Sequence, residues 1–236
     1  MFETEELADG FKVYISESHR FGTDAFLLAN FAALGHNEVV LDLCAGCGIV
    51  GFLLFLTKNP KLIHAVEVQK EAVDLMRRTV EENKLTNFDV RLADLRDLDS
   101  NAFHGGNINL IVCNPPYKAE FSGLLSKRGD VAIARHEVMC TIDDICKVAS
   151  RLLGVGGRLC LCQRSERLVD TLVTMRANKI EPKRIRFVSF KMGRSPWLFL
   201  VEGRRSGRPF LKIDPPLFLE ADSRATPELL GIYGKL

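Results

Sequence analysis

The sequence has no long hydrophobic run, no internal repeat and no low-complexity segment. Its longest apolar stretch, residues 52–56, is far shorter than the roughly 20 residues that a membrane-spanning helix needs. The acidic residues 1–6 also differ from the basic and then apolar start of a secretion signal. We therefore expect a cytoplasmic protein with no membrane partner.

A complete set of metal ligands is also missing. Cys44 and Cys47 form a C-x-x-C pair, but neither a second such pair nor a pair of histidines accompanies it. We therefore expect no metal and interpret the two residues as small side chains in a tight loop. The seven cysteines are an odd number, and most lie in apolar segments, which favours a reducing compartment. No Ser-His-Asp signature of a hydrolase is present.

Net charge is nearly absent, because the chain carries only +2 in total. The charge is nevertheless uneven. Residues 179–212 contain ten Lys and Arg against two Glu, so this segment carries +8 and the remainder −6. Such a segment either binds a polyanion or forms a solvated surface of strands and turns, and charge alone does not separate the two.

Short β-rich runs alternate with helical patterns from residue 39 onward, which predicts a parallel sheet with helices on both faces. We expect strands at 39–43, 63–68, 88–92, 108–113 and 158–162, and helices at 71–83 and 141–153. Further predictions are an antiparallel strand pair, 185–190 and 197–202, a short strand at 11–15, and a helix from Thr23 or Asp24, either of which can cap it, through 28–34. One domain over 1–236 is the economical division, with 1–36 as a lead-in and 37–236 as the sheet core with a basic C-terminal region.

A glycine-rich loop follows the first predicted strand of the sheet. Gly46-x-Gly48-x-x-Gly51 formally matches a dinucleotide-binding fingerprint, in which glycines let the backbone approach a ligand. Glu67 ends the next strand, 19 residues after Gly48, where a carboxylate can accept hydrogen bonds from ribose hydroxyls. The loop therefore predicts a site for an adenine nucleoside.

Two acidic residues bear on which nucleoside binds. Asp42 stands four positions before Gly46, where a carboxylate would repel the pyrophosphate of NAD but suit the ammonium and sulfonium of S-adenosylmethionine. The alternative role for Asp42 is that of a loop or helix cap. Asp94 follows the third strand and either accepts from an adenine amino group or belongs to a simple turn.

The strand at 108–113 runs directly into Asn114-Pro115-Pro116-Tyr117. Ligands of open α/β sheets lie beyond the carboxyl ends of the strands, so this strand aims Asn114 at the cofactor. The prolines fix the backbone, the carbonyl oxygens of Asn114 and Pro115 can accept from one planar NH₂ group, and Tyr117 offers a ring for a base to stack on. Two acceptors on the amine hydrogens turn the nitrogen lone pair toward the methyl group, so positioning carries most of the rate.

These motifs, in this order, resemble the class I S-adenosylmethionine-dependent amino methyltransferases, which methylate planar nitrogens. The residues that carry the resemblance are Asp42 to Gly48, Glu67, Asp94 and Asn114 to Tyr117. Within that class the chain is most similar to the bacterial tRNA-Val (adenine-N6) methyltransferases, which act on the adenosine at position 37 beside the anticodon. This narrower similarity rests on Phe21 to Ala25, Ala134 to Glu137 and Pro215 to Leu217.

The resemblance implies a Rossmann-like, seven-stranded, mostly parallel sheet, S-adenosylmethionine as cofactor, tRNA as partner and a base unstacked into the site. We expect a monomer. It implies catalytic roles for Asn114, Pro115 and Tyr117. The implied cofactor residues are Thr23, Asp24, Asp42, Cys44, Gly46, Gly48, Glu67, Asp94 and Asn114, with Thr23 and Asp24 near the methionine end. The implied substrate residues are Pro116, Tyr117, Lys118, Arg135, His136 and Arg194. Many relatives carry glycine in place of Cys44.

Other functions remain open at this point. The same motif serves glutamine-N5 methylation of a release factor, although those enzymes carry a longer helical region before the glycine loop, and guanine-N2 methylation of ribosomal RNA. An NAD-dependent oxidoreductase and a non-catalytic RNA-binding module are alternatives of other classes.

Overall fold

The computed structural model describes residues 2–99, 101, 103–115 and 140–234. The strands there are β1 (Glu3–Glu6), β2 (Lys12–Ile15), β3 (Val39–Leu43), β4 (Leu62–Glu67), β5 (Phe88–Leu92), β6 (Ile108–Cys113), β7 (Leu153–Arg164), β8 (Ile180–Lys191), β9 (Leu198–Arg205), β10 (Lys212–Ile213), β11 (Leu217–Ala221) and β12 (Arg224–Ala225). The helices are α1 (Thr23–Phe31), α2 (Ile49–Lys58), α3 (Lys70–Glu82), α5 (Ile142–Leu152), α6 (Leu168–Ala177) and α7 (Pro227–Tyr233).

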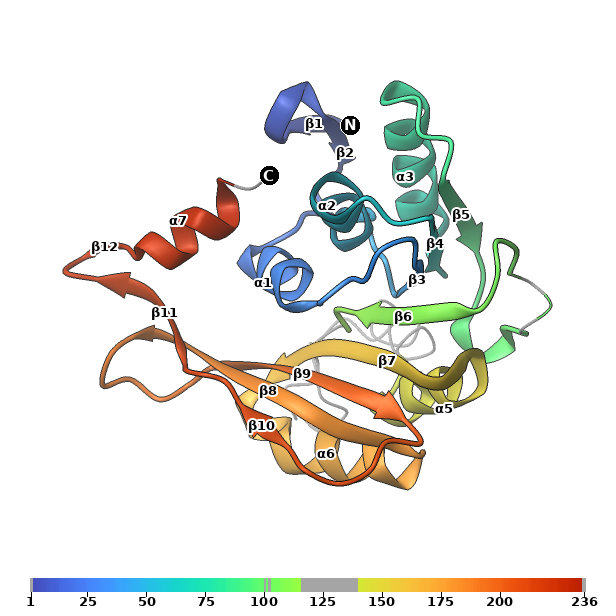
Figure 1. Cartoon of the computed structure of the whole chain (residues 1–236). Coiled ribbons are helices and arrows are strands. Elements are labelled where there is room, and N and C mark those ends of the chain that lie inside the picture. The colour runs from blue at the N-terminus through green and yellow to red at the C-terminus, as the bar shows by residue number, and fades with distance from the viewer. Residues whose placement is uncertain (1, 100, 102, 116–139, 235–236) are drawn as a thin grey trace, which may run out of the picture.

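The central sheet confirms the predicted α/β class (Figure 1). Its main path runs β8-β9-β7-β6-β3-β4-β5, with β7, β6, β3, β4 and β5 parallel and β9 antiparallel to both of its neighbours. In the described part of the chain the sheet has ten strands rather than seven, because β10 and β11 pair with β8 and β12 pairs with β11. The predicted antiparallel pair is therefore present, but three short strands follow it.

Helices cover both faces of the sheet, and this explains why its central strands are mostly apolar. Every residue of β3 and β4 is buried. One face packs against α1, α2 and α3 through residues such as Leu28, Phe52 and Met76. The other packs against α5 and α6 through residues such as Ile145 and Met175. Strands buried on both faces read as continuous apolar runs rather than alternating ones.

The predicted lead-in differs in detail from the structure. The strand at 11–15 is present as β2, but it pairs with β1 in a separate two-stranded sheet. Helix α1 ends at Phe31, before the predicted limit of residue 34, and the residue at its N-cap is Gly22. Neither Thr23 nor Asp24 caps it, because both lie inside its first turn and their side chains contact other elements. No described helix is both long and apolar enough to cross a membrane.

A candidate active site at the carboxyl edge of the sheet

The parallel strands β3, β4 and β6 end at one edge of the sheet and bring the glycine loop, Glu67 and Asn114 together. Leu43, the last residue of β3, is in register with Val66 of β4 and with Cys113 of β6. Because these three strands run in the same direction, the residues that follow them share one edge. This is the edge at which ligands of open α/β sheets bind.

The glycine loop has an open surface in front of it and a closed surface behind. Gly46 and Gly48 have left-handed backbones, with φ of 57° and 85°. A Cβ on Gly48 would lie 2.8 Å from side-chain atoms of Met76 and Phe52, so only glycine fits there. Among the described residues, a Cβ on Gly46 would meet nothing within 4 Å. The open side of Gly46 leaves backbone accessible to a ligand, as a nucleoside cradle requires.

Glu67 joins the glycine loop to the turn after β4. Its buried carboxylate accepts hydrogen bonds from the backbone N–H of Gly46 at 3.0 Å, of Val68 at 2.9 Å and of Gln69 at 3.0 Å. This residue therefore fixes the loop geometry, and its position at the end of β4 is the one predicted for a ribose ligand. The ribose contact itself stays a prediction.

Asp42 is 1% exposed and caps helix α2. Its Oδ2 accepts from the N–H of Gly51 at 2.9 Å, one of the first-turn donors that the helix leaves unpaired. The alternative considered for Asp42, a helix cap, is therefore present in the structure, and a contact with the cofactor ammonium stays a prediction. Burial raises the pKa of Asp42 from 3.8 to about 7.

The raised pKa of Asp42 predicts a pH-dependent effect of Asp42→Asn. Between about pH 4 and pH 7 the folded protein holds a proton that the unfolded chain has released, so stability falls as the pH rises through this window. Asparagine keeps an acceptor for Gly51 and carries no charge. We expect the variant to exceed the wild type in free energy of unfolding at pH 8 by about 4 kcal/mol, since the pKa is raised by about three units and one pKa unit is worth about 1.4 kcal/mol. Urea unfolding at several pH values measures this.

The matched control for Asp42→Asn is Asp97→Asn, which removes one carboxylate charge from an exposed position. A gap between variant and wild type that widens from pH 5 to pH 8 at Asp42, and not at Asp97, is the expected result. A constant gap would show that the Asp42 carboxylate is charged throughout this range.

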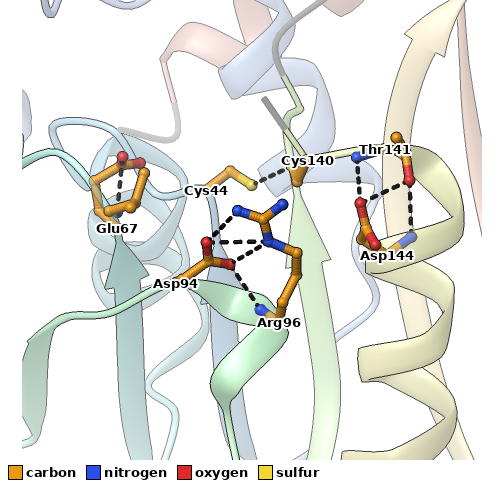
Figure 2. A network of polar contacts seen from close by, with 8 residues as sticks. Cys44, Glu67, Asp94, Arg96, Cys140, Thr141 and Asp144 are labelled. Atoms are coloured by element: carbon orange, nitrogen blue, oxygen red, sulfur yellow. Dashed lines mark hydrogen bonds and ion pairs between the residues drawn. The ribbon is translucent and has the colours of Figure 1, made fainter. Parts of the chain in front are cut away.

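Asp94 is held by a neighbouring arginine (Figure 2). Its carboxylate accepts from Arg96 Nε at 2.9 and 3.0 Å and from the Arg96 backbone N–H at 2.9 Å, which caps a single 3₁₀ turn, Leu95–Asp97. The Arg96 guanidinium holds the pKa of Asp94 below its usual range. The turn role that we considered is thus present, and recognition of an adenine amino group stays a prediction.

Asn114 is held at the tip of β6 by two residues far away in the sequence. Its Nδ2 donates to Asp24 Oδ2 at 3.1 Å, and its Oδ1 accepts from the Cys162 thiol at 3.1 Å. Asp24 lies in α1 and Cys162 in β7, so a helix and the strand next to β6 together orient the side-chain amide of Asn114. The structure therefore brings Asp24 to Asn114, and a place for Asp24 near the methionine end of the cofactor stays a prediction.

Thr23 is tied to a residue that the sequence did not indicate. Its hydroxyl lies 2.7 Å from the hydroxyl of Tyr233 in α7, and the ring of Tyr233 packs edge-on against Phe26 at 4.8 Å. Helix α7 thus supports the first turn of α1, where Asp24 lies. A Thr–Tyr pair 210 residues apart leaves no local sequence signal.

Several predicted site residues lie outside the described residues: Pro116, Tyr117, Lys118, Arg135 and His136. Pro115 is buried directly after Asn114. Arg194 is exposed in the turn between β8 and β9, at the carboxyl edge of the sheet.

The basic segment 179–212 divides into internal ion pairs and an exposed remainder. Arg184 pairs with Glu202 at 3.3 Å, Arg186 with Glu228 at 2.8 Å, and Lys212 with Asp214 at 2.8 Å. Lys183 donates to three backbone carbonyl groups, those of residues 208, 209 and 210. Much of this positive charge therefore stabilises the C-terminal strands.

Cys44 approaches Cys140 rather than Cys47. The sulfurs of Cys44 and Cys140 lie 3.2 Å apart (Figure 2), and all seven cysteines are free. The hydrogen bond to Cys113 raises the pKa of Cys44, and that to Cys44 raises the pKa of Cys140. Both groups therefore stay neutral thiols and are poor nucleophiles.

The backbone of Cys44 has a φ of 54°, a left-handed conformation that favours glycine. We expect Cys44→Gly to be more stable than Cys44→Ala by about 1 kcal/mol, the reverse of the usual order. Thermal unfolding of both variants measures the difference. Cys47, a buried residue of the same loop without a positive φ, provides the control, since Cys47→Ala should be more stable than Cys47→Gly. The same order at both positions would contradict this explanation.

One group of potential metal ligands occurs in the described residues: His64, Asp89 and His104. Both ring nitrogens of His64 are already used, since Nδ1 lies 2.9 Å from Asp89 Oδ2 and Nε2 lies 2.9 Å from the backbone oxygen of His104. The arrangement is that of a buried histidine that links β4 to β5 and to the loop before β6.

Comparison with known proteins shows the family of the chain. The family model of the methyltransferase small domain matches residues 12–178. A tRNA1(Val) (adenine(37)-N6)-methyltransferase from Flavobacterium psychrophilum is 27% identical over 145 residues, which are 59% of this chain and 59% of that protein. The chain thus spans about three fifths of this relative. A protein of the same name from Shewanella woodyi is 23% identical over 96% of this chain and 97% of its own.

A solved structure supports the fold over nearly the whole chain. The crystal structure of a predicted O-methyltransferase from Agrobacterium tumefaciens has a TM-score of 0.70, with 20% identity, and the match covers 90% of this chain and 96% of that one.

Proposed function

Since the chain belongs to the methyltransferase small domain family, we propose that it transfers a methyl group from S-adenosylmethionine to the exocyclic N6 of an adenosine in RNA, specifically the adenosine at position 37 of a valine tRNA. The observation that carries the proposal is the placement of Asn114, held by Asp24 and Cys162, at the same edge of the sheet as the glycine loop. The named relatives support tRNA as substrate. We further propose that the enzyme acts as a cytoplasmic monomer.

The residues of the edge fit S-adenosylmethionine as cofactor. The open side of Gly46 accommodates a nucleoside, and Glu67 at the end of β4 has the carboxylate that ribose hydroxyls need. Asp24 lies beside Asn114 and gives a negatively charged neighbour to a sulfonium or ammonium group. S-adenosylmethionine supplies a methyl group on a positively charged sulfur.

Asn114 prepares the amine for attack. Its Oδ1 and the Pro115 carbonyl accept the two hydrogens of the adenine amino group, which draws the lone pair out of the ring and directs it along the line of displacement. The new N–C bond forms as the C–S bond breaks, the sulfur keeps the electron pair, and one amine proton passes to solvent. Asp24 and Cys162 contribute by fixing the Asn114 side chain before the substrate arrives.

Nucleoside mass analysis tests the proposal. Purified protein is incubated with isotopically labelled S-adenosylmethionine and, in separate reactions, with tRNA, ribosomal RNA or release factor from cells that lack the gene. We expect labelled 6-methyladenosine at one site in valine tRNA. Labelled N2-methylguanosine in ribosomal RNA, or label in a glutamine of a release factor, would show that the enzyme transfers methyl groups to a different substrate. Binding of NADH in place of S-adenosylmethionine would reject the methyl transfer itself.

A further inference from the structure

The turn between β8 and β9, residues 191–197, lies at the same edge of the sheet as Asn114. Leu198 at the start of β9 is in register with Arg164 at the end of β7, and β7 in turn pairs with β6. In Figure 1 this hairpin projects on the side to which the β6 arrow points. With strands spaced about 4.8 Å apart, β9 lies about 10 Å from β6 across the sheet.

Two aromatic rings form a stack at the base of this hairpin. The rings of Phe190 and Trp197 lie 5.5 Å apart with an interplanar angle of 20°. The guanidinium carbon of Arg164 lies 5.5 Å from the Trp197 ring. Trp197 is half-buried against the core, whereas Phe190 is 54% exposed. Trp197 thus anchors the stack, and Phe190 presents a ring to solvent.

Positively charged residues lie in the hairpin and at the end of the neighbouring strand β7. Lys191, Arg194 and Arg164 are all exposed. Within the described chain, no carboxylate lies within ion-pair distance of Lys191 or Arg194, in contrast to Arg184, Arg186 and Lys212 of the same basic segment. These cations therefore serve no internal pair among the described residues and face solvent beside an aromatic surface.

We infer that the Phe190–Trp197 stack is a binding site for a nucleotide of single-stranded RNA next to the nucleotide that enters the active site. The base extends the stack on Phe190, while Lys191 and Arg194 contact the phosphates. Single-stranded nucleic acids are bound in this way, by aromatic rings within a basic surface. The inference rests on the proposed RNA substrate and adds the location and chemistry of a second contact.

Position in the sheet distinguishes this patch from the exposed apolar surface at residues 210–213. Phe210, Leu211 and Ile213 are also exposed, but β10 pairs with the middle of β8, away from the carboxyl edge. The nearby Lys183 and Lys212 are bound to backbone carbonyl groups and to Asp214. Of the two surfaces, the hairpin is therefore the one at the edge of the sheet that carries Asn114.

Intrinsic fluorescence reports on this site alone, because Trp197 is the one tryptophan of the chain. We expect unfractionated bacterial tRNA to quench this emission, and heparin, a polyanion without bases, to leave it nearly unchanged. Phe190→Ala should weaken tRNA binding about tenfold, within the range expected for one lost base stack. Phe190→Tyr should restore it. Phe210→Ala, which removes an 88% exposed ring elsewhere, should leave binding unchanged.

The phosphate contact is tested by salt dependence. Arg194→Ala should reduce the slope of log K against log salt concentration by about one, and the exposed Arg208→Ala should not. Equal effects of Phe190→Ala and Phe210→Ala, or tRNA binding without quenching, would overturn the inference and leave the hairpin for a different partner, such as a protein.

Failure of this inference and failure of the proposed function give different results. If adenosine is methylated but Phe190→Ala and Phe210→Ala have the same KM for tRNA, the nucleotide site is rejected and the proposed activity is kept. If tRNA quenches Trp197 and Phe190→Ala weakens binding, but no adenosine is methylated, the nucleotide site stands and the assigned substrate is rejected.

Discussion

Asn114→Ala is expected to lower kcat for methyl transfer by about 10³-fold or more, while the protein still folds and binds S-adenosylmethionine. The substitution removes one of the two acceptors that orient the amine lone pair, and such preorganised groups typically contribute two to three orders of magnitude. The half-buried position at the end of β6 limits the structural cost. Single-turnover transfer of labelled methyl groups to tRNA, with cofactor binding measured by calorimetry, gives both quantities.

Asn109→Ala provides a matched control on the same strand. Asn109 lies in β6 near its other end, where its Oδ1 accepts from the Val39 N–H at 2.9 Å. We expect this variant to lose about 1 kcal/mol of stability and to keep its activity at saturating substrate. Substantial turnover by Asn114→Ala would show that the amine is oriented by other groups, and the proposed mechanism would be wrong.

Glu67→Ala is expected to weaken S-adenosylmethionine binding by about 100-fold or more and to destabilise the protein by about 2 to 4 kcal/mol. The carboxylate accepts three backbone N–H groups, of Gly46, Val68 and Gln69, and each buried donor left unpaired costs about 1 to 3 kcal/mol. The total is smaller than three such costs because water can reach some of these N–H groups in the variant. Calorimetric titration and urea unfolding measure the two effects.

Glu71→Ala serves as the control for Glu67→Ala, because Glu71 is an exposed glutamate four residues later, in the first turn of α3. We expect cofactor affinity to be unchanged by this variant. Glu67→Gln separates the role of Glu67 in holding the loop from its role in binding the cofactor. Glutamine keeps one acceptor oxygen and replaces the other by a donor that faces an N–H group. Unchanged affinity in Glu67→Ala would exclude this carboxylate from cofactor binding.

The central strands were predictable because burial on both faces leaves an unmistakable sequence pattern. The predicted bounds 39–43 and 108–113 coincide with β3 and β6. The predicted bounds 88–92 also coincide with β5, although β5 is an edge strand in which only Phe88 is buried. Strand β7 begins at Leu153, five residues before the predicted start. The prediction missed its first half because Gly154, Gly156 and Gly157 interrupt the apolar pattern there. The two-residue strands β10 and β12 are too short for any periodicity to appear.

The glycine loop and the residues at the strand ends were predictable for a related reason: each follows a strand directly. The partners of Asn114 were harder to identify, because Asp24 is 90 residues away and only the folded topology brings it near. The resemblance located Asp24 in this region, but Cys162 and Tyr233 had no local signal. The capping roles of Asp42 and Asp94 could not be separated from ligand roles without geometry.

The contact between Thr23 and Tyr233 has a consequence for how the protein matures on the ribosome. Helix α7 is translated after every strand of the sheet, yet its tyrosine supports the turn of α1 that carries Asp24. A nascent chain can therefore assemble the sheet and the glycine loop while the neighbourhood of Asp24 still lacks its last support. The part of the candidate site around Asp24 is therefore complete only after residues 227–233 have left the exit tunnel.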